Sequence, residues 1–217
     1  MTDPADDDAA ISSRRGGYRK GTERRAQILD EMIRMVAEQG VDASSLRSVA
    51  DALGITHAAL RHYFPSRDEL LLAVYREHEV REQGAPERMK SAIGDTRESA
   101  ARNRAVPGLV QLYTTLSADA VQEGHPATRE FMRDRFTRLR ADLADLIRRD
   151  QSAGRIRDDL DPEDLASLSI AVSDGMQVQW LLDPDAVDGE RVLRLLERIV
   201  PPGEPRVSGP EAVLPAD

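Results

Sequence analysis

Apolar residues recur at helical spacing along most of the chain. The first stripe predicts a helix that begins near Thr22 and ends before Gly40, and its members are Ile28, Leu29, Met32, Ile33, Met35 and Val36. No stretch alternates apolar and polar residues as a half-buried strand does. The pattern therefore predicts an all-α protein of about nine helices.

In residues 46–63, the spacing of the apolar residues, a glycine and a helix cap predicts how two short helices are arranged. Gly54 lies between two short helical patterns and can adopt the left-handed conformation that ends the first, while Thr56 can cap the second with its hydroxyl. The small Ala50 allows close helix approach. Two helices that cross steeply form a helix-turn-helix, whose second helix, Thr56–Tyr63, would enter a DNA major groove. The alternative is an ordinary αα-hairpin inside a helical bundle.

Residues 64–70 favour the helix-turn-helix. Phe64 and Pro65 end the second helix, and Ser66 opens a third in which Ser66 and Glu69 form a capping box, each side chain accepting from the other residue's amide. Arg67 lies at the positive end of that helix, where it could bind phosphate.

Proline and glycine punctuation divides the remainder into predicted helices over 66–83, 86–102, 106–123, 126–153, 162–182 and 188–200. The predicted organisation is a disordered N-terminal arm (1–20), a three-helix DNA-binding domain (21–66), a helical regulatory and dimerisation domain (67–200) and a disordered tail (201–217). The basic residues of the arm are either solvated or reach into a neighbouring minor groove.

The helix predicted over 162–182 is apolar on two sides. Leu165, Leu168, Val172 and Met176 form one line, and Ala171, Gly175, Val178 and Leu182 form the other. A helix with two apolar sides usually has two partners, and Val192, Leu195, Leu196 and Ile199 give the last helix a further stripe. We expect these two helices to pair with those of a second copy as a four-helix bundle. The alternative is burial within one subunit.

Aromatic and methionine side chains gather in the predicted regulatory domain. They can line an adaptable apolar pocket, although most would serve equally well as ordinary core. The candidate ligand-binding residues are Tyr75, Met89, Leu112, Tyr113, Phe131, Phe136, Met176 and Trp180.

Positive and negative charges are unevenly distributed along the chain. The chain has a net charge of −9, yet residues 14–67 carry ten Lys/Arg against six Asp/Glu. A cationic region on an acidic protein is typical of a nucleic-acid-binding surface.

Composition and motifs also indicate where the protein resides and which kinds of chemistry it lacks. The chain has no cysteine, no apolar run long enough to span a membrane and no apolar segment after Arg14-Arg15 that would make an export signal, so we expect a soluble cytoplasmic protein. His57 and His62 are five residues apart, which is not the spacing of a helical metal pair, and no catalytic motif occurs. We expect no metal, no cofactor and no enzymatic activity.

The helix-turn-helix is preceded by a pattern made of Ile28-Leu29, Gly40, Ser44-Ser45-Leu46 and Val49-Ala50. Taken together, residues 24–72 resemble the DNA-binding domain of the TetR/AcrR family of bacterial regulators. Residues 133–188 are similar to the BetI-type regulatory domain. Geometry and resemblance together give the candidate DNA-binding residues Ser44, Ser45, Arg47, Thr56, His57, Ala58, Arg61, His62, Tyr63 and Arg67. The chain departs from many members, which carry Gly-Thr and then Tyr where this chain has Ala58, Ala59 and Arg61. The phosphate contacts of those hydroxyls must be lost or moved.

The resemblance implies a homodimeric regulator, most often a repressor, that binds a palindromic operator in double-stranded DNA and is released by a small apolar or amphipathic effector. A second hypothesis keeps DNA binding but assigns control to a protein partner, without a small-molecule effector. A third, an all-α enzyme with an incidental helix-turn-helix, would need a buried acid/base pair.

Overall fold

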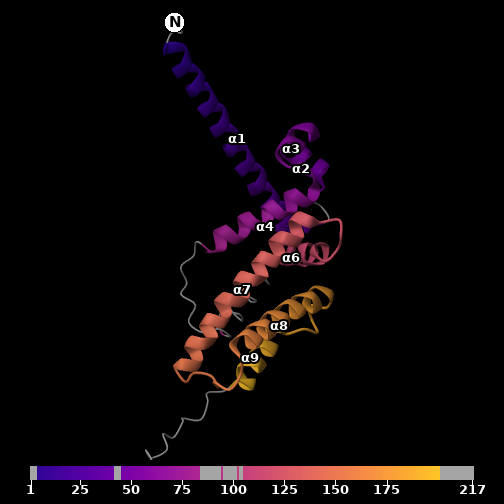
Figure 1. Cartoon of the computed structure of the whole chain (residues 1–217). Helices are drawn as coiled ribbons and strands as arrows, with labels where there is room; N and C mark the ends of the chain where they lie inside the picture. The colour runs from indigo at the N-terminus through magenta and orange to yellow at the C-terminus, as the bar shows by residue number, and fades with distance from the viewer. Residues whose placement is uncertain (1–3, 42–44, 84–93, 95–101, 103–104, 201–217) are drawn as a thin grey trace, which may run out of the picture. The chain divides into compact units, whose positions relative to one another are not determined.

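The structure is a computed structural model that describes residues 4–41, 45–83, 94, 102 and 105–200. Within these ranges every regular element is a helix, as predicted (Figure 1). The elements are α1 (Pro4–Gln39), α2 (Leu46–Ala52), α3 (His57–Tyr63), α4 (Arg67–Gln83), α6 (Pro107–Ala120), α7 (Pro126–Ser152), α8 (Pro162–Leu182) and α9 (Gly189–Ile199). Apart from residues 94 and 102, which are helical, the predicted helix over 86–102 lies outside the described residues, as does the predicted tail after residue 200.

Helix α1 is longer than the sequence predicted. It begins at Pro4 rather than near Thr22, in the segment predicted to be a disordered arm. The polar composition suggested disorder, but proline fits the first position of a helix, where its missing amide hydrogen costs nothing.

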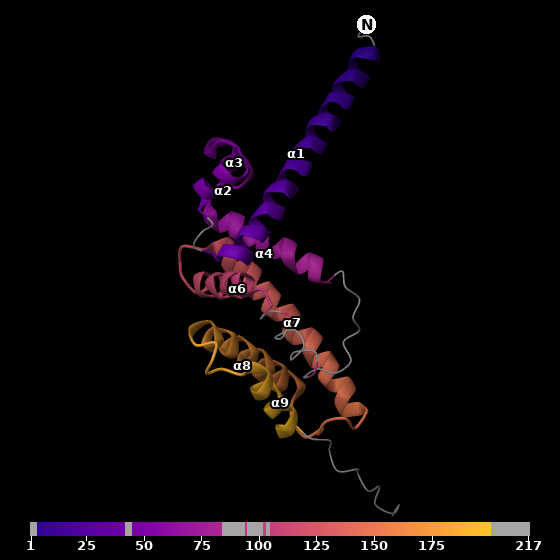
Figure 2. The ribbon, with the colours of Figure 1, turned by 180° about the vertical axis from the view of Figure 1, so that it is seen from behind.

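The chain forms two compact units, one from residues 1–87 and 101–135 and the other from 88–100 and 136–217. The first unit therefore extends past the predicted domain boundary at residue 66. The reason is that α4 and α6 both pack on α1, and α4 packs on α6. Figure 2 shows α4 crossing the C-terminal part of α1.

The core of the first unit includes residues from all three helices of the predicted DNA-binding domain and from α4 and α6. Its fully buried side chains include Ile28, Met32, Val36, Val49, Leu60, Phe64, Leu70, Leu71, Leu112 and Leu116. The predicted α1 stripe supplies three of these. Because α4 is buried against both α1 and α6, a shift of α4 would be felt by the helices on either side of it.

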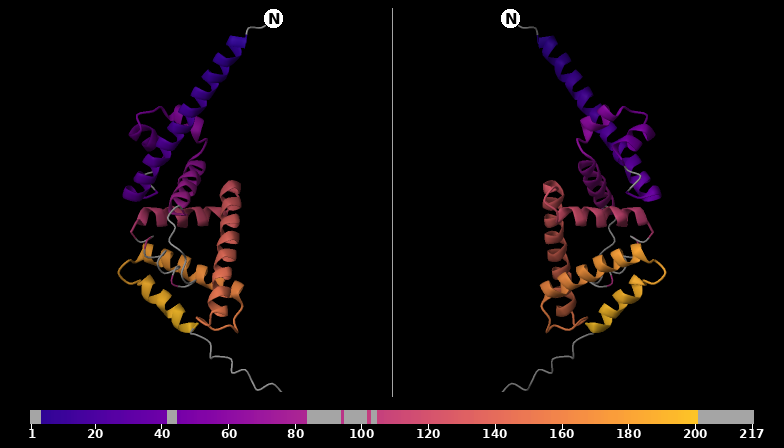
Figure 3. Two further views of the ribbon diagram at one scale, coloured as in Figure 1. Left: turned by 90° about the vertical axis from the view of Figure 1, so that its left-hand side faces the viewer. Right: turned by 90° about the vertical axis from the view of Figure 1, so that its right-hand side faces the viewer.

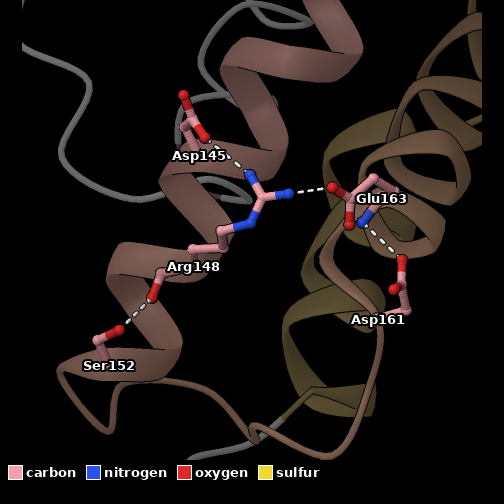
Figure 4. Close-up of polar contacts among 5 residues, drawn as sticks. All are labelled: Asp145, Arg148, Ser152, Asp161 and Glu163. Atoms are coloured by element: carbon pink, nitrogen blue, oxygen red, sulfur yellow. Dashed lines mark hydrogen bonds and ion pairs between the residues drawn. The ribbon is translucent and has the colours of Figure 1, made fainter.

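The second unit has its own core, formed where α8 and α9 pack beside the C-terminal half of α7. Buried members include Leu143, Ile147, Leu165, Ala166 and Leu196. The two views of Figure 3 both show α8 and α9 side by side. At the start of α8, Asp161 caps the helix through the amides of Glu163 and Asp164, and Arg148 of α7 pairs with both Asp145 and Glu163 (Figure 4).

The exposed face of α8 and α9 is also apolar. Its large exposed side chains are Leu168, Val178, Leu182, Leu195 and Ile199. On α9, Leu193 and Leu196 are buried instead, as is Val200, which ends the helix. The prediction of two apolar sides describes α8, but Leu168 lies on the exposed side with Val178 and Leu182, not with the buried Leu165. The single stripe predicted for α9 is divided, because Leu196 is buried while Leu195 and Ile199 are exposed.

Candidate nucleic-acid interface

Helices α2 and α3 are held in a helix-turn-helix by local signals. The Ser45 hydroxyl accepts from the Ser48 amide at 3.1 Å, and the Thr56 hydroxyl accepts from the Ala59 amide at 3.1 Å. Between the helices Gly54 has φ +61°, and the Ile55 amide donates to the Ala50 carbonyl at 3.0 Å. A positive φ is strained for residues with a Cβ, so this turn requires a residue such as glycine.

Helix α3 has one buried face and one exposed face. Leu60 is fully buried and Phe64, which ends the helix, is 2% exposed. The candidate DNA-reading side chains Thr56, His57, Ala58, Arg61 and His62 are all exposed. Among the described residues Arg61 has no carboxylate partner, so its guanidinium is available for a base edge or a phosphate.

The remaining candidates lie in more varied surroundings. Ser45 and Arg47 are exposed at the start of α2, and Ser44 lies outside the described residues. Tyr63 is half-buried, with its ring packed edge-on against the His62 ring at 5.5 Å.

Arg67 has an internal role that the sequence did not predict. Its guanidinium is partly buried and donates to the Val41 carbonyl at 3.0 Å, so it ties the start of α4 to the end of α1. The capping box at the same helix start has one of its two predicted bonds. The Glu69 amide donates to the Ser66 hydroxyl at 3.1 Å, but the Glu69 carboxylate accepts weakly, at 3.5 Å, from that hydroxyl and not from the Ser66 amide.

A turn before α7 also contacts the start of α4. The Nδ1 atom of His125 lies 2.8 Å from a carboxylate oxygen of Asp68. That Nδ1 atom makes no hydrogen bond with the described residues, so this is a close approach only, and the bond from Arg67 to the Val41 carbonyl is what holds the first turn of α4.

Three of the predicted ligand-binding residues form an aromatic cluster in the first unit. The rings of Tyr75 and Tyr113 stack with their centroids 5.8 Å apart, and the Phe131 ring lies edge-on to Tyr75 at 6.1 Å. Leu112 is fully buried beside them on α6. Phe136, Met176 and Trp180 are half-buried in the second unit, and Met89 lies outside the described residues.

A charged pair, not predicted from the sequence, lies against this cluster. The guanidinium carbon of Arg135 lies 5.0 Å from the Tyr113 ring centroid and 5.7 Å from that of Tyr75, and its Nε donates to Glu79 at 2.5 Å. Burial disfavours the charged form, but Tyr75, Glu79 and Tyr113 outweigh it, so the pKa of Arg135 is raised above its ordinary value. The available signal was helical spacing, because Tyr75 precedes Glu79, and Phe131 precedes Arg135, by four residues.

Other kinds of site find no support in the described part of the chain. There, no cluster of three His, Cys, Asp or Glu side chains could ligate a metal ion. None of the described helices combines the length and the hydropathy needed to cross a membrane.

Two family models match most of the folded chain. One, described as bacterial regulatory proteins of the tetR family, matches residues 28–74, which include α2, α3 and the first half of α4. The other, described as the C-terminal part of BetI-type transcriptional repressors, matches residues 110–201.

Individual relatives agree with these matches. The chain is 30% identical over 177 residues to the HTH-type transcriptional repressor Rv1474c of Mycobacterium tuberculosis, covering 82% of this chain and 92% of the relative. It is also 30% identical over 182 residues to the HTH-type transcriptional regulator BetI of Burkholderia pseudomallei, covering 79% and 89%.

Solved structures show the same fold. A TetR transcriptional regulator from Chloroflexus aurantiacus superposes with a TM-score of 0.66 at 21% identity, covering 85% of this chain and 100% of its own. A transcriptional regulator from Saccharomonospora viridis, solved in complex with choline, also gives 0.66 at 21% identity, covering 82% and 95%.

Proposed function

The chain belongs to the TetR family of bacterial regulatory proteins, and from this premise we propose that it is a homodimeric repressor that a small apolar or amphipathic molecule releases from a palindromic operator. The family consists of transcriptional regulators and not of enzymes. Because its target is genomic DNA, we place the protein in the cytoplasm.

The observation that carries the DNA-binding proposal is the division of α3 into two faces. Leu60 and Phe64 fix the helix to the core, so the orientation of its outer face is set by packing. That face presents Arg61 between His57 and His62, all exposed. A guanidinium on a rigid helix can donate two hydrogen bonds to guanine O6 and N7 in the major groove.

The test is a gel-shift titration with DNA from upstream of the protein's own gene. We expect Arg61→Ala to lower specific affinity by about tenfold to a hundredfold, since a bidentate base contact contributes about 1–3 kcal/mol. The matched control is Arg138→Ala, which removes an exposed arginine from α7. Unchanged affinity in Arg61→Ala, or an equal loss in Arg138→Ala, would refute α3 as the reading helix.

The proposal of a dimer is supported by the exposed apolar face of α8 and α9. Two such faces can form a four-helix bundle about a two-fold axis, which removes both from water. Two α3 helices related by this axis would read half-sites about 34–36 Å apart, one turn of DNA.

The proposal of a small-molecule effector is supported by the aromatic cluster on α4, α6 and α7, since aromatic side chains line most ligand pockets. Release of repression by about a hundredfold requires the effector to favour the non-binding state by about 2.7 kcal/mol. Control by a protein partner is the second candidate, and a thermal-shift screen with metabolites separates the two. A ligand that binds the native state raises the unfolding temperature, whereas partner control predicts no metabolite that does so.

A further inference from the structure

A groove of about 390 Å³ opens in the first unit among α1, the end of α3, α4 and the start of α7. This volume falls in the range of small-molecule sites. None of its lining residues belongs to the predicted ligand pocket, and two of them, Tyr63 and Phe64, are the last residue of α3 and the residue that ends it.

The floor of the groove is apolar. Leu29 of α1, Phe64 and Leu72 of α4 are each at most 4% exposed and are already part of the core, so they present a fixed surface. At the rim, Val80 of α4 is 65% exposed, so its side chain is accessible to a molecule in the groove. The groove can therefore take an apolar body.

The charges that line the groove are unbalanced in favour of cations. The guanidinium carbons of Arg25 and Arg76 lie 5.0 Å from the Phe64 ring and 4.8 Å from the Phe131 ring. Among the described residues, neither guanidinium has a carboxylate within ion-pair distance.

The two acidic side chains of the groove do not neutralise this charge. Glu77 is paired with Arg81 at 3.0 Å, and Arg81 also pairs with Asp30 at 2.5 Å. Only Glu69 is then left against two guanidiniums, and its carboxylate accepts from the Ser66 hydroxyl. The guanidinium of arginine has paired N–H donors that match carboxylates and phosphates in geometry and charge.

We propose that this groove binds an amphipathic organic anion, with its apolar body on Leu29, Leu72 and Val80 and its acidic group between Arg25 and Arg76. The proposal goes beyond the proposed function and stands on the groove alone, without requiring DNA binding or dimerisation. An occupant would touch the C-terminal end of α3 through Tyr63 and Phe64.

The test is calorimetric titration of the full chain with decanoate, kept below the concentration at which it forms micelles. Decanol and decyltrimethylammonium carry the same chain with a neutral and a cationic head. We expect decanoate to bind at one site per chain, with the other two at least tenfold weaker, because each charge-assisted hydrogen bond contributes about a factor of ten. Equal binding of decanol, or no binding of decanoate, would overturn the proposal.

Three variants locate the site. Arg25→Gln and Arg76→Gln should each weaken decanoate about tenfold, and Val80→Glu, which puts a carboxylate on an exposed rim position, should abolish binding. Arg138→Gln removes an equivalent charge outside the groove and should have no effect. Normal affinity in all three groove variants would place decanoate elsewhere and refute the assignment. A gel-shift without decanoate reports the DNA-binding proposal separately, so either proposal can fail while the other stands.

Discussion

The guanidinium of Arg135 on α7 donates to the carboxylate of Glu79 on α4 at 2.5 Å, and both side chains are only about one-fifth exposed. The pair lies against the stacked rings of Tyr75 and Tyr113. It joins α4 to α7.

Breaking this pair from one side should destabilise the protein markedly. Arg135→Met leaves the Glu79 carboxylate without its partner in a mostly buried place, so we expect a loss of about 3 kcal/mol in the free energy of unfolding, measured in urea. Arg133→Met, on the same helix and in an exposed pair with Asp134, should change it by less than about 0.5 kcal/mol.

The double variant Arg135→Met with Glu79→Met provides the control. It removes both charges, so it should lose less than the sum of the two single variants. Strict additivity would show that the two side chains do not interact.

Gly108 of α6 should not tolerate a side chain. A Cβ at this position would lie 1.7 Å from the carbonyl oxygen of Val36, and backbone cannot yield as a flexible side chain does. Gly108→Ala must then push α6 away from α1, with an expected loss of about 3 kcal/mol in unfolding free energy.

Gly21→Ala is the matched control for this glycine. Gly21 lies inside α1 with open space around it, so alanine there should add about 0.5–1 kcal/mol through helix propensity. A neutral Gly108→Ala would mean that α1 and α6 are less closely packed than the structure shows.

The features that could be predicted from the sequence are those that depend on neighbours in the chain. The Thr56 cap, the Gly54 turn and the ends of α7 and α8 follow from residues within a few positions of one another, and the structure contains all of them. The identification of the family rests on the same local features.

The features that were missed depend on partners distant in the sequence. The bond from Arg67 to the Val41 carbonyl joins residues 26 apart, and nothing in the sequence shows that they lie within reach of each other. The Arg135–Glu79 pair joins residues 56 apart, and only the packing of α4 on α6 and α7 brings them together. The DNA-contacting residues themselves stay predictions.

The cap of α3 should contribute measurable stability apart from any role in DNA binding. Thr56→Ala removes the acceptor for the Ala59 amide, so we expect a loss of about 1 kcal/mol in unfolding free energy. Thr56→Ser retains a hydroxyl and should recover most of it. If alanine and serine behave alike in denaturation, the hydroxyl does not act as a cap.

The exposed apolar face of α8 and α9 should control the oligomeric state. Leu195, 51% exposed on α9, is far enough from the monomer core for Leu195→Glu to fold, but a carboxylate at the centre of a four-helix interface would be buried without a partner. We expect light scattering after size exclusion to give a dimer for the natural chain and a monomer for Leu195→Glu.

Val121→Glu is the matched control. Val121 is 81% exposed in the turn after α6, outside this face, so the Val121→Glu variant should remain dimeric. The Leu195→Glu monomer should also bind a full palindrome much more weakly. A dimer contacts both half-sites at once, whereas a monomer contacts only one. A dimeric Leu195→Glu, or a natural chain that is monomeric at micromolar concentration, would contradict dimerisation through this face.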